Sequence, residues 1–118
     1  MKSKNMILEG NFKGYKLYYH KNYGLFFKKN VFDPEYTQIG KRNILNYEVI
    51  TKDSYVDGTS AVIKGGLASS LLGAPGLLAG LSAKTNDIYW VAIEWGNHTK
   101  SLLEMDSNLY HQLILSLF

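Results

Sequence analysis

Short runs of aromatic and aliphatic residues alternate with polar residues over the first part of the chain, a period-two pattern that is typical of β-strands. Two aromatic-rich runs, residues 15–20 and 23–28, are separated only by a lysine and an asparagine. We therefore predict two strands joined by a tight turn. Residues 6–9 are predicted to form an earlier strand, which ends at a glycine because glycine favours turns.

The same alternation returns later in the chain. Residues 44–51 are predicted to form a strand whose drier face carries Leu45, Tyr47 and Val49. Residues 88–95 and 98–105 flank Gly96-Asn97, a pair that favours the positive backbone angles of two-residue loops. These residues predict a β-hairpin.

A helical pattern follows this hairpin. Asp106 or Ser107 is suited to cap a helix, because a short oxygen-bearing side chain accepts hydrogen bonds from the unpaired amides of the first turn. The apolar residues that follow recur at helical spacing and form one stripe: Leu109, Leu113, Ile114 and Leu117. We expect this stripe to pack on the sheet.

Residues 65–83 form an uncharged, glycine-rich segment between Lys64 and Lys84. Small residues recur in it at intervals of four, as in a glycine zipper, which lets helix backbones approach closely. Pro75 interrupts the segment near its middle. We predict two short helices, residues 66–74 and 75–83, folded as a helical hairpin insert with Pro75 at the first position of the second helix.

Three roles remain open for this insert. It is an internal hairpin packed on the sheet, an exposed apolar hairpin that mediates self-association or partner binding, or a loop that dips into a membrane. The residues predicted to contact a partner or a membrane are Leu67, Leu71, Leu72, Pro75, Leu77, Leu78 and Leu81. The residues predicted to pack the insert are Gly66, Gly73, Gly76 and Gly80.

Length and composition predict one domain spanning residues 1–118, because 118 residues suffice for a single hydrophobic core. The net charge of +3 is uneven, since residues 1–59 carry ten Lys/Arg against six Asp/Glu. The chain has no cysteine, which excludes disulfides and cysteine-based sites. The apolar run that ends at Leu8 is followed at once by Glu9, so no signal-peptide core forms and we expect a cytoplasmic location.

Groups that could carry out catalysis are few. The three histidines are expected on the surface, because none stands beside a Ser or Asp in a nucleophile pattern and their spacing suits no metal site: His20, His98 and His111. Glu94 and Glu104 are expected to face outward in a charge ladder with Lys100, not to form an acid–base pair. No glycine-rich loop is followed by the Lys-Ser/Thr pair that holds phosphates. We predict neither an enzyme nor a bound metal or cofactor.

Nucleic-acid binding is a weaker interpretation. Nine tyrosines, together with Trp90, Trp95 and Lys28-Lys29, match the composition of proteins that stack single-stranded bases. Aromatic residues in strands more often pack in a core or in cross-strand pairs. Nucleic acid is therefore not expected as a partner.

From about residue 36 onward, the order of elements along the chain is similar to that of a known group of proteins. The residues that carry this similarity are Asn43-Ile44, residues 47–50, the segment 65–83, residues 88–97, residues 102–106 and residues 113–118. In this order the chain resembles small bacterial proteins with a pleckstrin-homology-like (PH-like) domain interrupted by a glycine-rich apolar insert. The resemblance implies an α+β fold: a mostly antiparallel sheet, or partly open PH-like barrel, with a C-terminal helix and the helical insert. It carries over no lipid-binding site, because the lysines of the first strands are scattered: Lys13, Lys16, Lys21, Lys28 and Lys29.

Together these patterns favour a non-catalytic protein-interaction module. Its sheet edge or its apolar insert is expected to dock on a protein partner or on a second copy, giving a homo-oligomer. One form of this hypothesis is a bacterial or phage inhibitor that docks on a larger host defence complex. The alternative is a peripheral membrane-binding module that uses leucines of residues 65–83 and nearby lysines.

Overall fold

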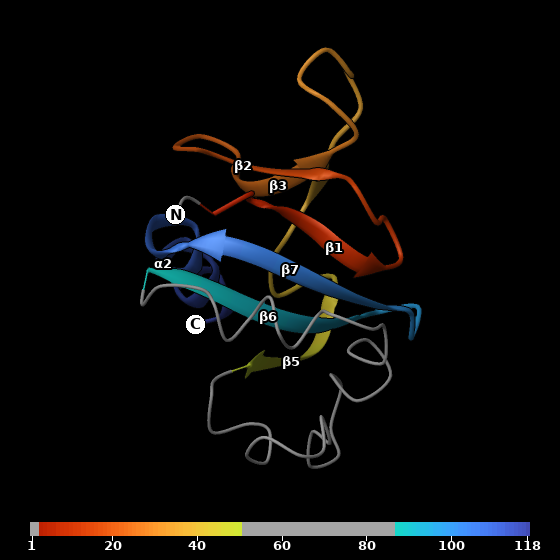
Figure 1. Cartoon of the computed structure of the whole chain (residues 1–118), viewed down its shortest axis with the longest axis vertical. Helices are drawn as coiled ribbons and strands as arrows, with labels where there is room; N and C mark the ends of the chain where they lie inside the picture. Colours follow the sequence, from red (N-terminus) through yellow and green to blue (C-terminus); the bar gives the residue numbers. More distant parts are fainter. Residues whose placement is uncertain (1–2, 51–86) are drawn as a thin grey trace.

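The computed structural model describes residues 3–50 and 87–118. In this part of the chain seven strands form one antiparallel sheet in the order β4-β3-β2-β1-β7-β6-β5, and the helix α2 (Ser107–Leu117) follows it (Figure 1). The strands are β1 (Met6–Gly10), β2 (Lys16–His20), β3 (Gly24–Lys28), β4 (Thr37–Gln38), β5 (Ile44–Ile50), β6 (Ile88–Trp95) and β7 (Lys100–Asp106).

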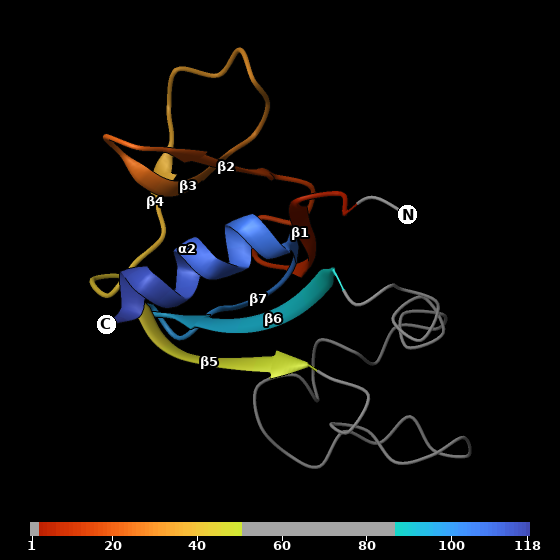
Figure 2. The same cartoon turned by 90° about the vertical axis from the view of Figure 1, so that its left-hand side faces the viewer.

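The sheet consists of two meanders that meet at β1 and β7. Ile7 of β1 lies opposite Leu103 of β7 at this junction. The sheet curves into a half-barrel, and α2 lies between its two halves, on the concave side (Figure 2). The core fills the space between the helix and this face: Ile7, Leu17, Leu25, Phe27, Ile39, Val91, Ile93, Trp95, Leu103, Met105, Leu109 and Leu113.

The two predicted hairpins and the first strand are confirmed. Leu17 pairs with Phe27 between β2 and β3, and Val91 pairs with Leu103 between β6 and β7. All four side chains are buried on the concave face because side chains at every second position of a strand point the same way. In β2 and β3 one face is buried, whereas both faces of β6 and β7 carry buried residues.

Helix α2 begins where the sequence predicts. The Asp106 carboxylate accepts a hydrogen bond from the backbone N–H of Leu109 at 2.8 Å, as an N-cap does. Leu109 and Leu113 are buried, and Leu117 packs against the core. No helix within the described ranges is long and apolar enough to cross a membrane.

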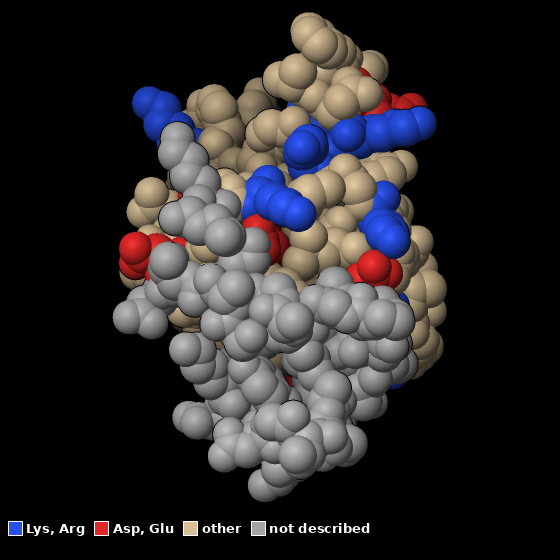
Figure 3. Space-filling view, in the orientation of Figure 1, with Lys and Arg blue, Asp and Glu red and all other residues tan. Residues whose placement is uncertain are grey.

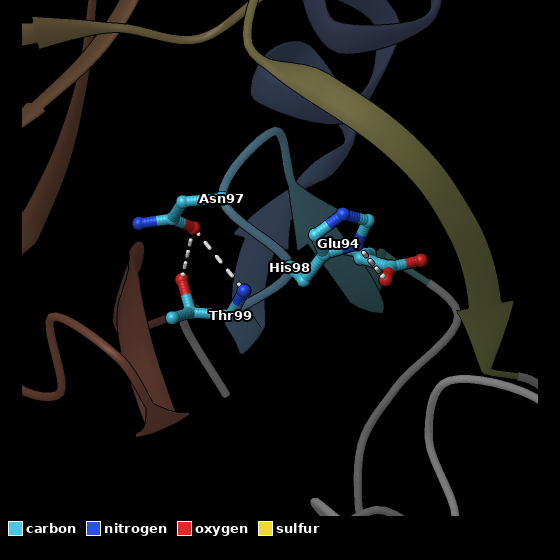
Figure 4. A network of polar contacts seen from close by, with 4 residues as sticks. All are labelled: Glu94, Asn97, His98 and Thr99. Atoms are coloured by element: carbon cyan, nitrogen blue, oxygen red, sulfur yellow. Dashed lines mark hydrogen bonds and ion pairs between the residues drawn. The ribbon is translucent and has the colours of Figure 1, made fainter.

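The loop of the second hairpin differs from the prediction. It has three residues between Trp95 and Thr99, and the N–H of Trp95 donates to the carbonyl of Thr99 at 2.8 Å. The positive φ falls on His98, at +69°, and not on Gly96. The side-chain oxygen Oδ1 of Asn97 accepts from the N–H and the hydroxyl of Thr99 at 3.1 and 2.6 Å (Figure 4). A three-residue loop of this kind needs one left-handed residue at its end, which explains the shift.

A β-bulge changes the faces of β5. The pairing with β6 shifts between Ile44 and Asn46, so Leu45 leaves the ladder and is 54% exposed. Tyr47 and Val49 pack against the core as predicted. The prediction for Leu45 was wrong because a bulge inserts one residue and moves it out of the alternation.

The predicted fold class is corrected. The described residues form a mostly antiparallel, seven-stranded half-barrel with α2 as their helix, and no helical hairpin is found among them. The predicted insert, residues 65–83, lies outside the described residues. That prediction took the spacing of small residues as a sign of helices, whereas the spacing only lets existing helices approach closely. Glycine and proline are the weakest helix formers, so the composition of the segment argued against it.

Candidate functional site

The outer, convex face of β2 and β3 carries the feature that stands out in the described structure. Leu17, Leu25 and Phe27 point inward and are buried. Their neighbours Tyr18 and Phe26 therefore lie on the outer face, directly opposite each other in register. An aromatic pair on this face does not belong to the core around α2.

Five rings on this side form a continuous chain of contacts, which we call the aromatic strip: Tyr18, His20, Tyr23, Phe26 and Tyr36. The Tyr18 and Phe26 rings stack with centroids 5.6 Å apart. Phe26 meets Tyr36 edge to face at 5.3 Å, and Tyr36 meets Tyr23 at 6.0 Å. Tyr23 in turn lies 4.9 Å from the His20 ring. The Tyr23 and Tyr36 side chains are about half exposed, at 53% and 48%.

Two lysines stand next to each other at one end of the aromatic strip. Lys16 of β2 lies opposite Lys28 of β3 in register. Lys28 Nζ is 5.8 Å from the centre of the Tyr18 ring and donates to the carbonyls of Val31 and Asp33, each at 3.2 Å. Like charges directly opposite each other on a sheet repel, and no carboxylate is paired with either lysine in the described part of the chain.

The positive charge of the chain is concentrated in the stretch of sequence that contains the aromatic strip. Residues 12–43 carry seven Lys/Arg and two Asp/Glu, a net charge of +5, whereas the remaining residues carry six and eight, a net charge of −2. Lysine and arginine side chains gather over β1–β3 on the face seen in Figure 3. This part of the surface therefore attracts anionic groups.

The loop between β3 and β4 adds exposed apolar side chains. It projects from the body of the molecule (Figure 1), with Phe32 90% and Val31 61% exposed. The N–H of Phe32 donates to the Asn30 side chain at 3.0 Å, and the N–H of Glu35 donates to that of Asp33 at 3.0 Å. These side-chain bonds shape the loop, which returns to the sheet beside Tyr36.

A groove of about 660 Å³ adjoins the aromatic strip, and we call it the β4–α2 groove. Its lining comprises Tyr23, Gly24, Leu25, residues 36–43 and Ser116 of α2. Tyr23 and Tyr36 belong both to the groove and to the aromatic strip. Lys41 and Arg42 are the charged residues of the lining, which contains no carboxylate.

The partner-contact and packing residues predicted within residues 65–83 lie outside the described residues. The aromatic strip was not predicted from the sequence, although its tyrosines and lysines are visible there. Aromatic residues in strands were predicted to pack in the core, and the lysines of the first strands are scattered along the chain. Only the pairing of Tyr18 with Phe26 and of Lys16 with Lys28 gathers these residues on one face.

The predicted surface histidines are confirmed, since His20, His98 and His111 are exposed. Glu94 pairs with Lys100 in register as expected, and its carboxylate is 3.4 Å from His98 Nδ1 (Figure 4). No group of three His, Asp or Glu residues in the described ranges is placed to hold a metal ion.

The prediction for Glu104 was wrong. Its side chain is buried, at 1% exposure, and it accepts hydrogen bonds from the Trp90 indole N–H at 3.0 Å and from the backbone N–H of Lys4 at 2.6 Å. Glu104 lies opposite Trp90 and Glu94 lies opposite Lys100, so the two carboxylates stand at different levels of the hairpin. They do not form an acid–base pair.

The described fold and surface define a half-barrel with an exposed strip of aromatic and basic residues. Comparison of the chain with protein-family models, with curated proteins and with solved structures finds no match. The resemblance to PH-like bacterial proteins therefore stays a prediction.

Proposed function

We propose that this protein is a non-catalytic interaction module that docks an acidic segment of a partner protein on its aromatic strip. The observation that carries the proposal is the position of Lys16 and Lys28, opposite each other and beside the stacked rings of Tyr18 and Phe26. A partner carboxylate between the two ammonium groups turns a repulsive pair into an attractive site.

The exposed rings support a protein partner. Tyrosine and phenylalanine are enriched in protein interfaces because they bury a large area with few rotatable bonds. Tyr23 and Tyr36 are half exposed while fixed by ring contacts, so little side-chain entropy is lost when a partner covers them. Val31 and Phe32 extend the apolar part of the same surface.

The concentrated charge supports an acidic partner. The net charge of +5 in residues 12–43 complements a segment rich in Asp and Glu, and opposite potentials speed encounter and fix the register of docking. Docking through residues 65–83, homo-oligomerisation, the membrane alternative and a cytoplasmic location stay predictions.

A random peptide library tests the proposal without a named partner. Peptides selected on the full chain should be enriched in Asp and Glu. Their affinity, measured by fluorescence anisotropy, should fall with rising salt because exposed charges are screened. Replacing both lysines, Lys16→Glu and Lys28→Glu, should weaken the selected peptides at least about tenfold.

The matched control is the double variant Lys2→Glu and Lys4→Glu, which changes the net charge equally outside residues 12–43. It should leave peptide binding within about twofold of the original chain. Selection of neutral peptides, or equal loss in both double variants, contradicts the proposal. Tighter binding of an oligothymidylate or of anionic vesicles than of any selected peptide assigns the surface to nucleic acid or to lipid instead.

A further inference from the structure

We propose that the β4–α2 groove binds a small organic phosphate that carries a planar ring, a nucleoside monophosphate being the matched ligand. This site shares Tyr23 and Tyr36 with the aromatic strip, but it uses its own cations, Lys41 and Arg42, and the proposal does not rest on peptide docking. The groove volume of about 660 Å³ falls within the range of small-ligand sites, roughly 300–1,000 Å³.

One end of the groove is built for an anion. Lys41 and Arg42 are both exposed and follow each other at the turn that leads into β5. Neither forms an ion pair or a side-chain hydrogen bond within the part of the chain that the structure describes. A guanidinium presents two parallel N–H donors to a phosphate, and the neighbouring ammonium adds a second positive charge.

The turn that carries these two cations is held in shape by Asn43. Its side-chain oxygen Oδ1 accepts from the N–H of Gly40 at 3.0 Å, and its side-chain nitrogen Nδ2 donates to the backbone carbonyl of Gln38. The N–H of Ile44 donates to the carbonyl of Gly40 at 3.0 Å and closes the turn. A fixed turn reduces the entropy lost when an anion is bound.

The other part of the groove is built for a ring. Leu25 and Ile39 are buried at its base. Tyr23 and Tyr36 form an aromatic wall, and the Gln38 side chain donates to the carbonyl of Tyr23 at 2.9 Å, which ties this wall to β4. Aromatic walls bind planar heterocycles by stacking.

Ser116, in the last turn of α2, also lines the groove. The phosphate is placed at the exposed cations Lys41 and Arg42, and the ring is placed against Tyr23 and Tyr36.

Titration of the isotope-labelled full chain with AMP, followed in amide NMR spectra, tests this site. Saturable shifts are expected at Tyr23 and over residues 36–43, with a Kd of about 1 mM or tighter. Adenosine and inorganic phosphate, each of which matches one end of the groove, should bind at least about tenfold more weakly. The affinity of phenyl phosphate should be higher than that of adenosine or inorganic phosphate and lower than that of AMP.

The variant Lys41→Gln with Arg42→Gln should weaken AMP at least about tenfold, because both changes lie on an exposed turn and remove only the anion end. The control Lys13→Gln should bind AMP as the original chain does. Absence of saturation at about 10 mM AMP, or inorganic phosphate binding as tightly as AMP, overturns the proposal. The double variant Lys16→Glu and Lys28→Glu should keep AMP binding within about twofold, so failure of either site is seen independently of the other.

Discussion

Asn5 and Asp106 hold each other through two hydrogen bonds. The Asn5 side-chain oxygen Oδ1 accepts from the backbone N–H of Asp106 at 2.9 Å, and the Asn5 side-chain nitrogen Nδ2 donates to the Asp106 carboxylate at 3.1 Å. The second carboxylate oxygen of Asp106 caps α2 at Leu109. Asn5 has a φ of +48°, which asparagine tolerates better than most residues. One carboxylate therefore joins the beginning of the chain, the end of β7 and the start of the helix.

Replacing Asp106 with alanine should lower the free energy of unfolding by about 1–3 kcal/mol, because the helix loses its cap and Asn5 loses an acceptor. Denaturant unfolding measures this loss. The variant Asp106→Ser keeps a capping oxygen and should recover roughly half of it. Equal stability of the alanine variant and the original chain would show that water replaces both bonds at no cost.

Replacing His98 with glycine should raise the free energy of unfolding by about 1 kcal/mol. His98 has a φ of +69°, a conformation that glycine adopts without strain. The ion pair with Glu94 is exposed and contributes little. His98→Ala loses the same ion pair but keeps the strain, so only the glycine variant should show a higher Tm. A gain shared by both variants would assign the effect to the imidazole and not to the backbone.

The elements were predictable from the sequence because they depend on local patterns. The alternation in β2 and β3 and the capping oxygen of Asp106 are local signals that tertiary contacts then confirm. The loop at His98 and the bulge at Leu45 were not predictable. Both depend on which backbone groups pair across β5, β6 and β7, and a shift of one residue leaves the composition unchanged.

The candidate surface was not predictable for the same reason. Phe26 and Tyr36 are separated by the β3–β4 loop and meet because Phe26 pairs with Gln38 in β4, a strand of two residues. An edge strand of two residues is too short to show an alternation of apolar and polar residues in the sequence. The burial of Glu104 was also hidden, because the buried positions of β7 occupy both faces and give no period-two pattern.

Replacing Ser101 with alanine should lower the free energy of unfolding by about 1–3 kcal/mol. The fully buried Ser101 hydroxyl accepts from the Trp95 indole N–H at 2.8 Å and donates to the carbonyl of Asn11 at 2.5 Å. Alanine at this position leaves the Trp95 indole N–H and the Asn11 carbonyl without a hydrogen-bond partner. A double-mutant cycle with Trp95→Phe should give a coupling energy of about 1 kcal/mol or more, and strict additivity would contradict this account.

Stability at alkaline pH should depend on Tyr110. Burial raises the pKa of its phenol, and the neighbouring phenols of Tyr47 and Tyr89 raise the pKa further. The folded chain therefore keeps this proton at a pH where the unfolded chain, with a tyrosine pKa of about 10, has lost it. The stabilisation is complete below about pH 10 and is lost as the pH rises toward the raised pKa. Tyr110→Phe should flatten this decline in denaturant unfolding, and an unchanged pH profile would contradict it.

Replacing Lys16 alone with glutamate should separate stability from binding. A glutamate at position 16 faces Lys28 across β2 and β3, so a like-charge pair becomes an opposite-charge pair and the free energy of unfolding should rise by about 0.2–1 kcal/mol. The same change places a carboxylate where the partner's carboxylate is proposed to lie, so acidic peptides should bind more weakly.

Lys16→Gln is the matched control, because it removes the repulsion without adding a negative charge. It should raise the free energy of unfolding less than Lys16→Glu and should weaken peptide binding less. If Lys16→Glu raises the free energy of unfolding and weakens peptide binding, Lys16 serves binding although it lowers the stability of the fold. If Lys16→Glu is instead less stable than the original chain, Lys16 supports the sheet through its aliphatic stem, and the like-charge pair no longer argues for an acidic partner.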